Sequence, residues 1–287
     1  MSGLTVGLVP LNGGRVGALR GSRLRGYRQG RLKTAGCAGV VLPPSSREEA
    51  IRQARNALNV GLGRRGSKGS SDLSVKQRIS RGNKRLLLEF PLPRDTADDV
   101  ASLARDLVEE VASEKTVLCF GSREACQRAK ALNLANCYHA DESIPKQLKA
   151  TSLVMVCVNE SQASFLLGSR WQSVILINPK GFSERTSKVA GSFETVYQFL
   201  PLLVQGFLFS KSEGALLKCL SDSEGPESSK WNIFLKDGKS FRRIASQSSR
   251  PDEDELELAL YNNVASSNPV IKGMKSVKSK VDEMFSK

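Results

Sequence analysis

Three glycines, Gly61, Gly63 and Gly66, form a GxGxxG pattern, the spacing with which a dinucleotide-binding loop approaches a pyrophosphate. That chemistry needs a strand before the glycines and a helix after them, so that the phosphate meets the helix N-terminus. Here a segment of helical periodicity precedes them and a Gly- and Ser-rich run follows. The stretch also falls short of a P-loop, because Ser67 stands where a lysine is required. We interpret the pattern as chance in a Gly/Arg-rich linker and predict no cofactor.

Residues that bind metals or act as nucleophiles are scattered along the chain. The single histidine, His139, has no second histidine and no cysteine at ligand spacing, so the sequence predicts no metal site. No GxSxG or HExxH motif occurs, and pairs such as Asp98 and Asp99 fall on predicted helices, where a solvated face is ordinary. We therefore predict no catalytic residues and lean against an enzyme. The six cysteines form no CxxC pair and are expected to be buried, reduced thiols: Cys37, Cys119, Cys126, Cys137, Cys157 and Cys219.

The residues that follow two apolar runs are better candidates for contact with a ligand or partner. Asn159 follows one run, and Asn178 with Pro179 follows another. Ligands of open α/β sheets bind beyond the carboxyl ends of parallel strands, where these residues are expected to lie. The alternative is plain turn chemistry, because Asn and Pro are turn formers. Asn159, Asn178 and Pro179 remain the candidate contacts.

Apolar runs of strand length alternate with segments of helical periodicity over the middle of the chain. The first helix begins at a capping box, formed by Ser45 with Glu48 or by Ser46 with Glu49, and is expected to stop at Gly61. The strands are predicted over residues 85–90, 116–120, 153–158 and 173–177, and further helices over 96–111, 122–132 and 160–168. This alternation predicts an α/β fold with a mainly parallel sheet flanked by helices.

The C-terminal half has a different texture. The runs FETVYQFLPLLVQGFLFS, ALLKCL, WNIFL and SFRRIA are predicted to add antiparallel strands to the sheet, and an acidic helix is expected from Asp252 to Leu260. The most apolar stretch, Phe199 to Phe209, is shorter than the roughly 20 residues of a membrane span and contains Pro201. We expect a core strand or a kinked helix there.

The formal net charge of +14 lies in two segments. Residues 1–40 carry seven basic residues and no acid, which is typical of a transit peptide. Residues 61–85 carry eight basic residues and only Asp72, among five Gly and five Ser. From residue 86 onward, 25 bases face 26 acids. We predict a transit peptide over residues 1–38, one domain over 43–265 and a Lys-rich tail over 266–287.

The basic segment at residues 61–85 is predicted to be a flexible insert within that domain. It has the charge to attract nucleic acid but no Phe, Tyr or Trp on which bases could stack. Binding to RNA is therefore expected only as nonspecific, electrostatic attachment. The alternative for the whole N-terminal arm is a basic extension that stays attached and binds polyanions.

The order of several segments resembles a family of chloroplast and cyanobacterial proteins that share a domain of unknown function and include the low photosystem II accumulation proteins of plants. The resemblance spans Pro43 to Leu260 and rests on PPSSREEAIRQARNAL, LLLEFPLP, SLVMVCVN, RWQSVILINP, FETVYQFLPLLVQG, ALLKCL, KWNIFL and SRPDEDELELAL. Relatives often carry an acidic residue directly after the strand that corresponds to VLCF, where this chain has Gly121 and Ser122. The resemblance implies a plastid protein with no established catalytic residues.

Two functions follow as expectations. The first is a non-enzymatic auxiliary or assembly factor of photosystem biogenesis, located in the stroma or at the thylakoid surface. Its partner would be a chloroplast protein, such as a photosystem subunit or an assembly factor. The second is a nucleotide- or small-metabolite-binding α/β enzyme of the stroma that uses the strand ends at Asn159 and Asn178.

Overall fold

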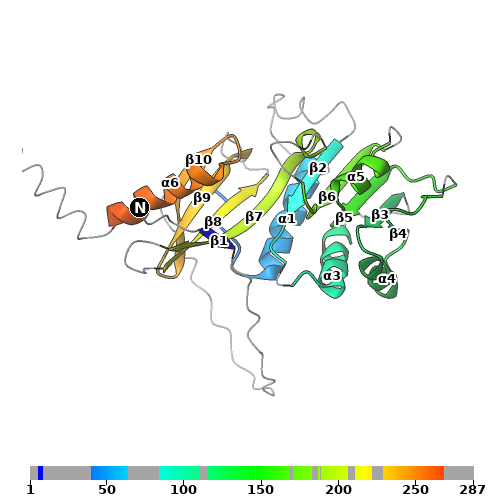
Figure 1. Cartoon of the computed structure of the whole chain (residues 1–287), viewed down its shortest axis with the longest axis horizontal. Coiled ribbons are helices and arrows are strands. Elements are labelled where there is room, and N and C mark those ends of the chain that lie inside the picture. Colours follow the sequence, from blue (N-terminus) through cyan, green and yellow to red (C-terminus); the bar gives the residue numbers. More distant parts are fainter. Residues whose placement is uncertain are drawn as a thin grey trace, which may run out of the picture.

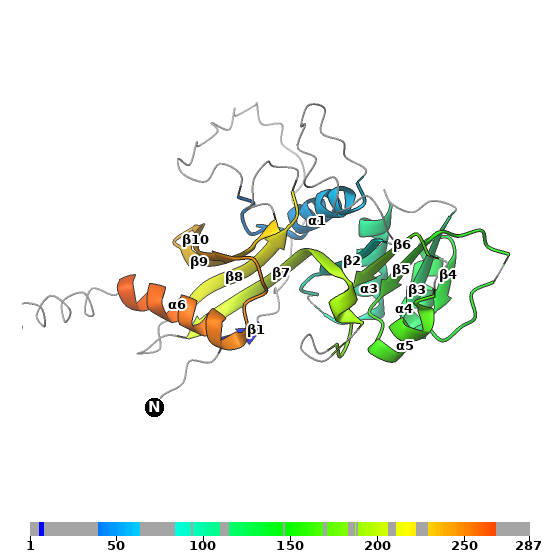
Figure 2. The ribbon, with the colours of Figure 1, turned by 90° about the horizontal axis from the view of Figure 1, so that it is seen from above.

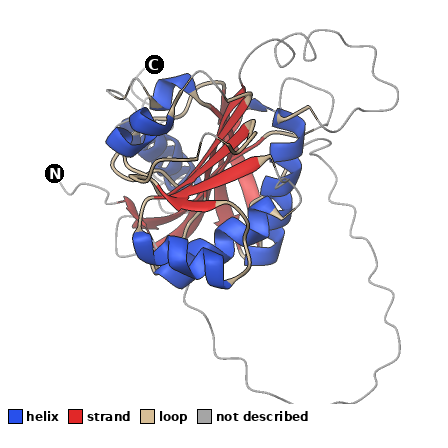
Figure 3. Ribbon diagram, turned by 90° about the vertical axis from the view of Figure 1, so that its right-hand side faces the viewer, coloured by secondary structure: helices blue, strands red, loops and turns tan. Residues whose placement is uncertain are grey.

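The computed structural model describes residues 6–8, 40–63, 84–92, 94–109, 115–145, 147–168, 171–182, 187, 189–205, 211–221 and 229–267. In these residues ten strands form one sheet, and helices pack on both of its faces (Figures 1 and 3). The predicted α/β fold is confirmed, as are the parallel sheet and its antiparallel C-terminal extension.

The strands follow the order β10-β9-β8-β7-β2-β6-β5-β3-β4, and β1 pairs with β7. The parallel part contains β2 (Lys84–Glu89), β3 (Thr116–Phe120), β4 (Cys137–His139), β5 (Ser152–Val156) and β6 (Ser173–Ile177). The antiparallel part contains β8 (Lys211–Cys219), β9 (Trp231–Asp237), β10 (Ser240–Gln247) and β1 (Val6–Leu8).

Strand β7 (Glu194–Gln205) joins the two parts. It pairs in parallel with β2 as far as Gln198 and in antiparallel fashion with β8 along nine residues. The sequence analysis predicted only the antiparallel pairing. The first half of β7 is parallel because Glu194 enters the sheet beside Leu86 and the strand then runs in the direction of β2.

Three helices cover one face of the sheet: α1 (Arg47–Gly61), α3 (Ala97–Val108) and α4 (Arg123–Ala131). Each begins at a side chain that accepts a backbone N–H, which replaces a hydrogen bond missing in the first turn: Ser46, Thr96 and Ser122. Their apolar faces pack on alternate residues of the strands, among them Leu86, Leu88, Phe120 and Ile177. This is the largest of the three hydrophobic clusters in the described part.

The opposite face carries two separate hydrophobic clusters. Helix α5 (Glu160–Leu166) and Trp171 pack against β3, β5 and β6, while α6 (Glu253–Ser267) packs against β8 and β9. Figure 2 shows α1 on one side of the sheet and both α5 and α6 on the other. Between these two clusters, Glu89 on β2 and Gln198 on β7 form a polar pair across the two strands.

Some sequence expectations need correction. The short strand β4 was not predicted, and Leu132, which was expected to face inward, is exposed. Helix α6 extends past Leu260 to Ser267. The insert expected over residues 61–85 is narrower, because Gly61 ends α1 and Lys84 begins β2.

Several other expectations fall wholly or partly outside the described residues. They concern Cys37, the insert at residues 64–83, the tail at residues 268–287 and all of the predicted transit peptide except residues 6–8, which form β1. The apolar stretch beginning at Phe199 is a strand as far as Gln205, where the description breaks off.

Candidate functional site

The carboxyl ends of β2 and β6 form a crevice at a switch in the topology. The two strands are neighbours, but the chain after β2 leads to α3 on one face of the sheet. The chain after β6 packs on the other face, where Phe182, Val189 and Phe193 join the cluster around α5. Ligands of open α/β sheets bind at such points, because the diverging connections leave space between the strand ends.

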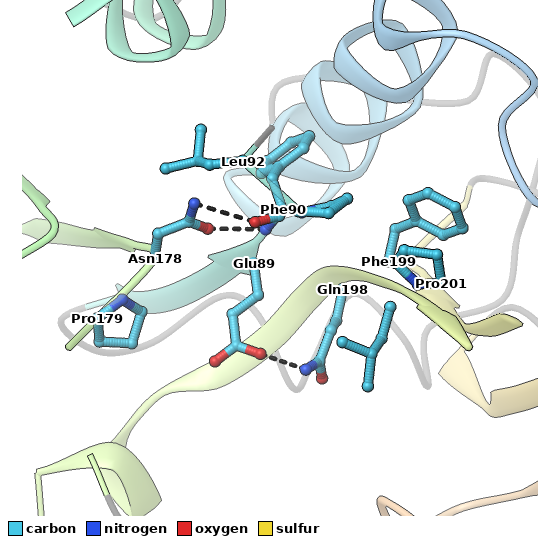
Figure 4. A pocket seen from close by; sticks show the side chains of 10 residues that line it. Glu89, Phe90, Leu92, Asn178, Pro179, Gln198, Phe199 and Pro201 are labelled. Carbon is cyan, nitrogen blue, oxygen red and sulfur yellow. Dashed lines mark hydrogen bonds between the residues drawn. The ribbon is translucent and has the colours of Figure 1, made fainter. Parts of the chain in front are cut away.

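A pocket of about 420 Å³ occupies this crevice (Figure 4). It is bounded by the residues that follow β2, by those that follow β6 and by the middle of β7. The lining is Glu89, Phe90, Pro91, Leu92, Asn178, Pro179, Gln198, Phe199, Leu200 and Pro201. Most of these side chains are apolar, and the polar groups are few, which is the usual composition of a small-molecule site.

Asn178 builds the wall of the pocket. Its backbone has a positive φ of 46°, which Asn adopts more readily than most residues. Its side-chain oxygen accepts the N–H of Phe90 at 2.7 Å, and its side-chain nitrogen donates to the carbonyl of Phe90 at 3.1 Å (Figure 4). These two hydrogen bonds tie the end of β6 to the end of β2. Both polar atoms of the Asn178 side chain are therefore hydrogen-bonded to the backbone of Phe90.

The other polar groups in the lining are Glu89 and Gln198, which pair across β2 and β7. The amide nitrogen of Gln198 donates to the carboxylate of Glu89, and within the part of the chain that the structure describes the amide oxygen of Gln198 has no hydrogen-bond partner. Burial raises the pKa of Glu89, and the nearby guanidinium of Arg250 opposes that increase. The sequence analysis missed both residues. A lone glutamine inside the apolar run FETVYQFLPLL was the signal that could have indicated Gln198.

A transverse polar row continues from this pair across the C-terminal strands. Gln198 pairs with Lys218 on β8, and Lys218 pairs with Trp231 on β9. The ammonium of Lys218 lies 5.2 Å from the centre of the Trp231 ring, and the guanidinium of Arg250 lies 5.7 Å from it. Arg250 also reaches Glu89, with a nitrogen–oxygen distance of 3.9 Å. Burial lowers the pKa of Lys218 and of Arg250, so both cations are partly desolvated.

The other sequence candidates have different positions. Pro179 lines the pocket beside Asn178, whereas Asn159 lies at the end of β5 and caps α5. The side-chain oxygen of Asn159 accepts the backbone N–H of Gln162, and the side-chain oxygen of Gln162 accepts the backbone N–H of Asn159. The structure therefore brings Asn178 and Pro179 together and leaves Asn159 outside.

The helix N-termini at this edge of the sheet are poorly suited to bind phosphate. Thr96, Ser122 and Asn159 already occupy first-turn N–H groups of α3, α4 and α5. Each first turn also carries acidic residues, which repel an anion where the helix dipole would otherwise attract it. As the sequence analysis inferred, a helix precedes Gly63 of the GxGxxG pattern; Gly66 and Ser67 lie outside the described residues.

Five cysteines lie in the described residues. Cys119, Cys126, Cys137 and Cys157 are buried as predicted, and Cys219 is half-buried. Burial raises the pKa of Cys157 to about 11, which disfavours the nucleophilic thiolate at neutral pH. In this part of the chain no group of three His, Cys, Asp or Glu residues could hold a metal ion. None of the helices described is long and apolar enough to cross a membrane.

The fold and the pocket define an open α/β protein with a crevice at a switch point. The model of the domain of unknown function DUF1995 matches residues 44–258, so the chain belongs to that family. No curated protein and no solved structure matches the chain.

Proposed function

We propose that the protein is a non-enzymatic auxiliary factor of the chloroplast that acts in photosystem biogenesis by binding another protein. Two features of the sequence support the plastid part of the proposal: the acid-free basic segment at residues 1–40 and the resemblance in segment order to the low photosystem II accumulation proteins. The binding mode rests on a feature of α6.

Helix α6 has apolar residues on two sides. Leu256 and Leu260 are buried against β8 and β9, whereas Leu258 is 61% and Tyr261 50% exposed. Together with Asp254, these two residues recur at helical spacing along the outward side, here named the α6 outer face. Exposed apolar residues aligned on one helix suit contact with another protein better than contact with water.

The surroundings of the α6 outer face indicate the chemistry of the partner. Acidic residues fill the first turn of the helix: Glu253, Asp254 and Glu255. A partner segment with apolar side chains flanked by lysine or arginine would match both the apolar and the acidic groups. We therefore propose a basic, partly apolar segment of a chloroplast protein as the binding partner.

The alternative of a nucleotide-dependent enzyme has less support. Its phosphate groups would meet helix N-termini that are already capped and acidic, and the pocket lacks a basic residue in its lining. A small-molecule function of the pocket does not depend on phosphate.

Affinity isolation from chloroplast extract tests the protein-binding function. The bait is residues 39–287, compared with the double variant Leu258→Ser/Tyr261→Ser and with the control Leu42→Ser, which changes another exposed leucine remote from α6. We expect specific partners to be retained by the wild type and the control and lost from the double variant, and the reverse isolation with a tagged partner to recover the protein. Equal recovery by all three baits would refute binding through α6.

A further inference from the structure

Gln198 is 3% exposed, lines the pocket at the switch point and has a carbonyl oxygen with no hydrogen-bond partner among the described residues. Buried polar atoms in native proteins are almost always paired, so an exception inside a pocket points to a group supplied from outside. We propose that this pocket binds a small, uncharged aromatic molecule whose N–H or O–H group donates a hydrogen bond to the amide oxygen of Gln198.

The requirement for a donor follows from the pairing of Gln198. Its amide nitrogen donates one hydrogen bond to Glu89, which orients the amide and leaves its oxygen as the buried polar atom without a partner among the described residues (Figure 4). The ring nitrogen of an indole or the hydroxyl of a phenol supplies one such donor. A site that uses a buried acceptor discriminates strongly against an analogue without the donor, because the acceptor then stays unpaired.

The preference for an aromatic body follows from the rings in the lining. Phe90, Pro179, Phe199 and Pro201 contribute ring side chains to the lining; Figure 4 shows Phe90, Phe199 and Pro201 on the other side of β7 from the amide of Gln198, so a ligand that contacts both must extend from one side of the sheet to the other. Phe90 is supported from behind by Tyr197, with ring centres 4.9 Å apart. Flat, rigid walls of this kind favour ring stacking. A volume of about 420 Å³ is enough for a molecule of one or two rings.

We expect the ligand to be uncharged because charged side chains already surround Gln198. An anionic ligand would approach the carboxylate of Glu89, which lines the pocket. A cationic ligand would compete with Arg250, whose guanidinium already lies 3.9 Å from that carboxylate, and would meet the field of Lys218 beyond Gln198. A neutral molecule avoids both penalties.

Matched probes test the donor on the unmodified protein. Indole is compared with 1-methylindole, and phenol with anisole, by ligand-detected NMR titration; the members of each pair differ in the N–H or O–H group. We expect indole and phenol to bind about 3- to 10-fold more tightly than their methylated partners, the effect of one net hydrogen bond. Equal affinities within each pair, or no binding of any probe, would overturn the proposal.

Variants assign the acceptor. Gln198→Met keeps the length of the side chain but removes the amide, and should abolish the preference for indole over 1-methylindole. The control Gln247→Met makes the same change on β10, outside the pocket, and should keep the preference. A preference that persists in Gln198→Met refutes the assignment. The Leu258→Ser/Tyr261→Ser variant should bind the probes normally, which separates this site from the α6 outer face.

Discussion

Gly121 occupies a position that has no room for a side chain. A Cβ atom there would lie 2.1 Å from the carbonyl oxygen and 2.8 Å from the carbonyl carbon of Cys157, and both are backbone atoms. The turn after β3 therefore packs directly on the turn after β5, and the N–H of Gly121 donates to Val156 at 2.9 Å. An acidic side chain could not stand at position 121 without moving the neighbouring strand end.

We expect Gly121→Ala to destabilise the domain. Forcing a methyl group against backbone atoms costs about 1–3 kcal/mol, which lowers the melting temperature by roughly 2–4 °C for each kcal/mol in a domain of this size. Gly168→Ala is the matched control, because no atom lies within 4 Å of its added Cβ. Equal melting temperatures for the two variants would contradict the close packing of the turns.

Glu89 should give the stability of the protein a measurable pH dependence. Burial raises its pKa in the folded state above the ordinary value of 4.5, so folding favours the protonated carboxyl. The resulting stabilisation is fully present below about pH 4.5 and is lost as the pH rises through the folded pKa. Glu89→Gln mimics the protonated form and should melt at a higher temperature than the wild type near pH 8. The difference should close as the pH falls toward 4, and a constant difference would show that Glu89 titrates normally.

At the residue scale, sequence reasoning located the strand ends but not the atoms available to a ligand. Asn178 and Pro179 were identified because turn residues after an apolar run mark the carboxyl end of a strand. The free acceptor of Gln198 depends on the register that places this residue beside Glu89. Register between strands about a hundred residues apart in the chain is a tertiary property, which local patterns do not specify.

Helix α3 shows the clearest agreement between pattern and structure. Its residues Val100, Leu103, Ala104, Leu107 and Val108 recur at helical spacing and are buried. We expect Leu107→Asp to unfold the domain, because an unpaired buried carboxylate costs several kcal/mol against a typical total stability of about 5–15 kcal/mol. Leu107→Met, which conserves volume, should remain folded. Circular dichroism during heating distinguishes these outcomes, and a native-like transition in Leu107→Asp would mean that α3 is not packed as described.

The elements that sequence patterns predicted are those with strong local signals. Strands β3 and β6 match their predicted bounds, and α1 starts at one of the two proposed caps, Ser46. Strand β4 escaped prediction because it has only three residues and owes its extended form to pairing with β3. The parallel pairing of β7 was not predicted for the same reason. It depends on β2, which lies about a hundred residues earlier in the chain.

At the scale of the whole molecule, β7 and Arg250 connect the parallel and antiparallel parts. Strand β7 passes through both, and Arg250, just before α6, spans from Trp231 on β9 to Glu89 on β2. The proposed ligand pocket lies at this junction, while the α6 outer face lies on the antiparallel part. A ligand in the pocket would therefore contact both parts through β2, β6 and β7.

The basic insert can be removed without disturbing this arrangement, because its two ends are held together by the fold. The side chain of Lys84, at the start of β2, donates to the carbonyl of Leu62, at the end of α1. We expect replacement of residues 64–83 by six Gly and Ser residues to change stability by only about 1 kcal/mol, since loop-closure entropy varies slowly with length. Differential scanning calorimetry measures this change, and a large loss of stability would mean that the insert is part of the folded core.

The same replacement tests the charge of the insert. Residues 64–83 carry six basic residues, so the wild type should bind single-stranded RNA without sequence preference and with an affinity that falls steeply as salt increases. If all six contact phosphates, the slope of log affinity against log salt is about −4. We expect the shortened protein to lose this binding and to keep both the partner recovered through α6 and the preference of the pocket for indole. Loss of the partner together with the insert would transfer the binding surface from the α/β domain to the basic segment.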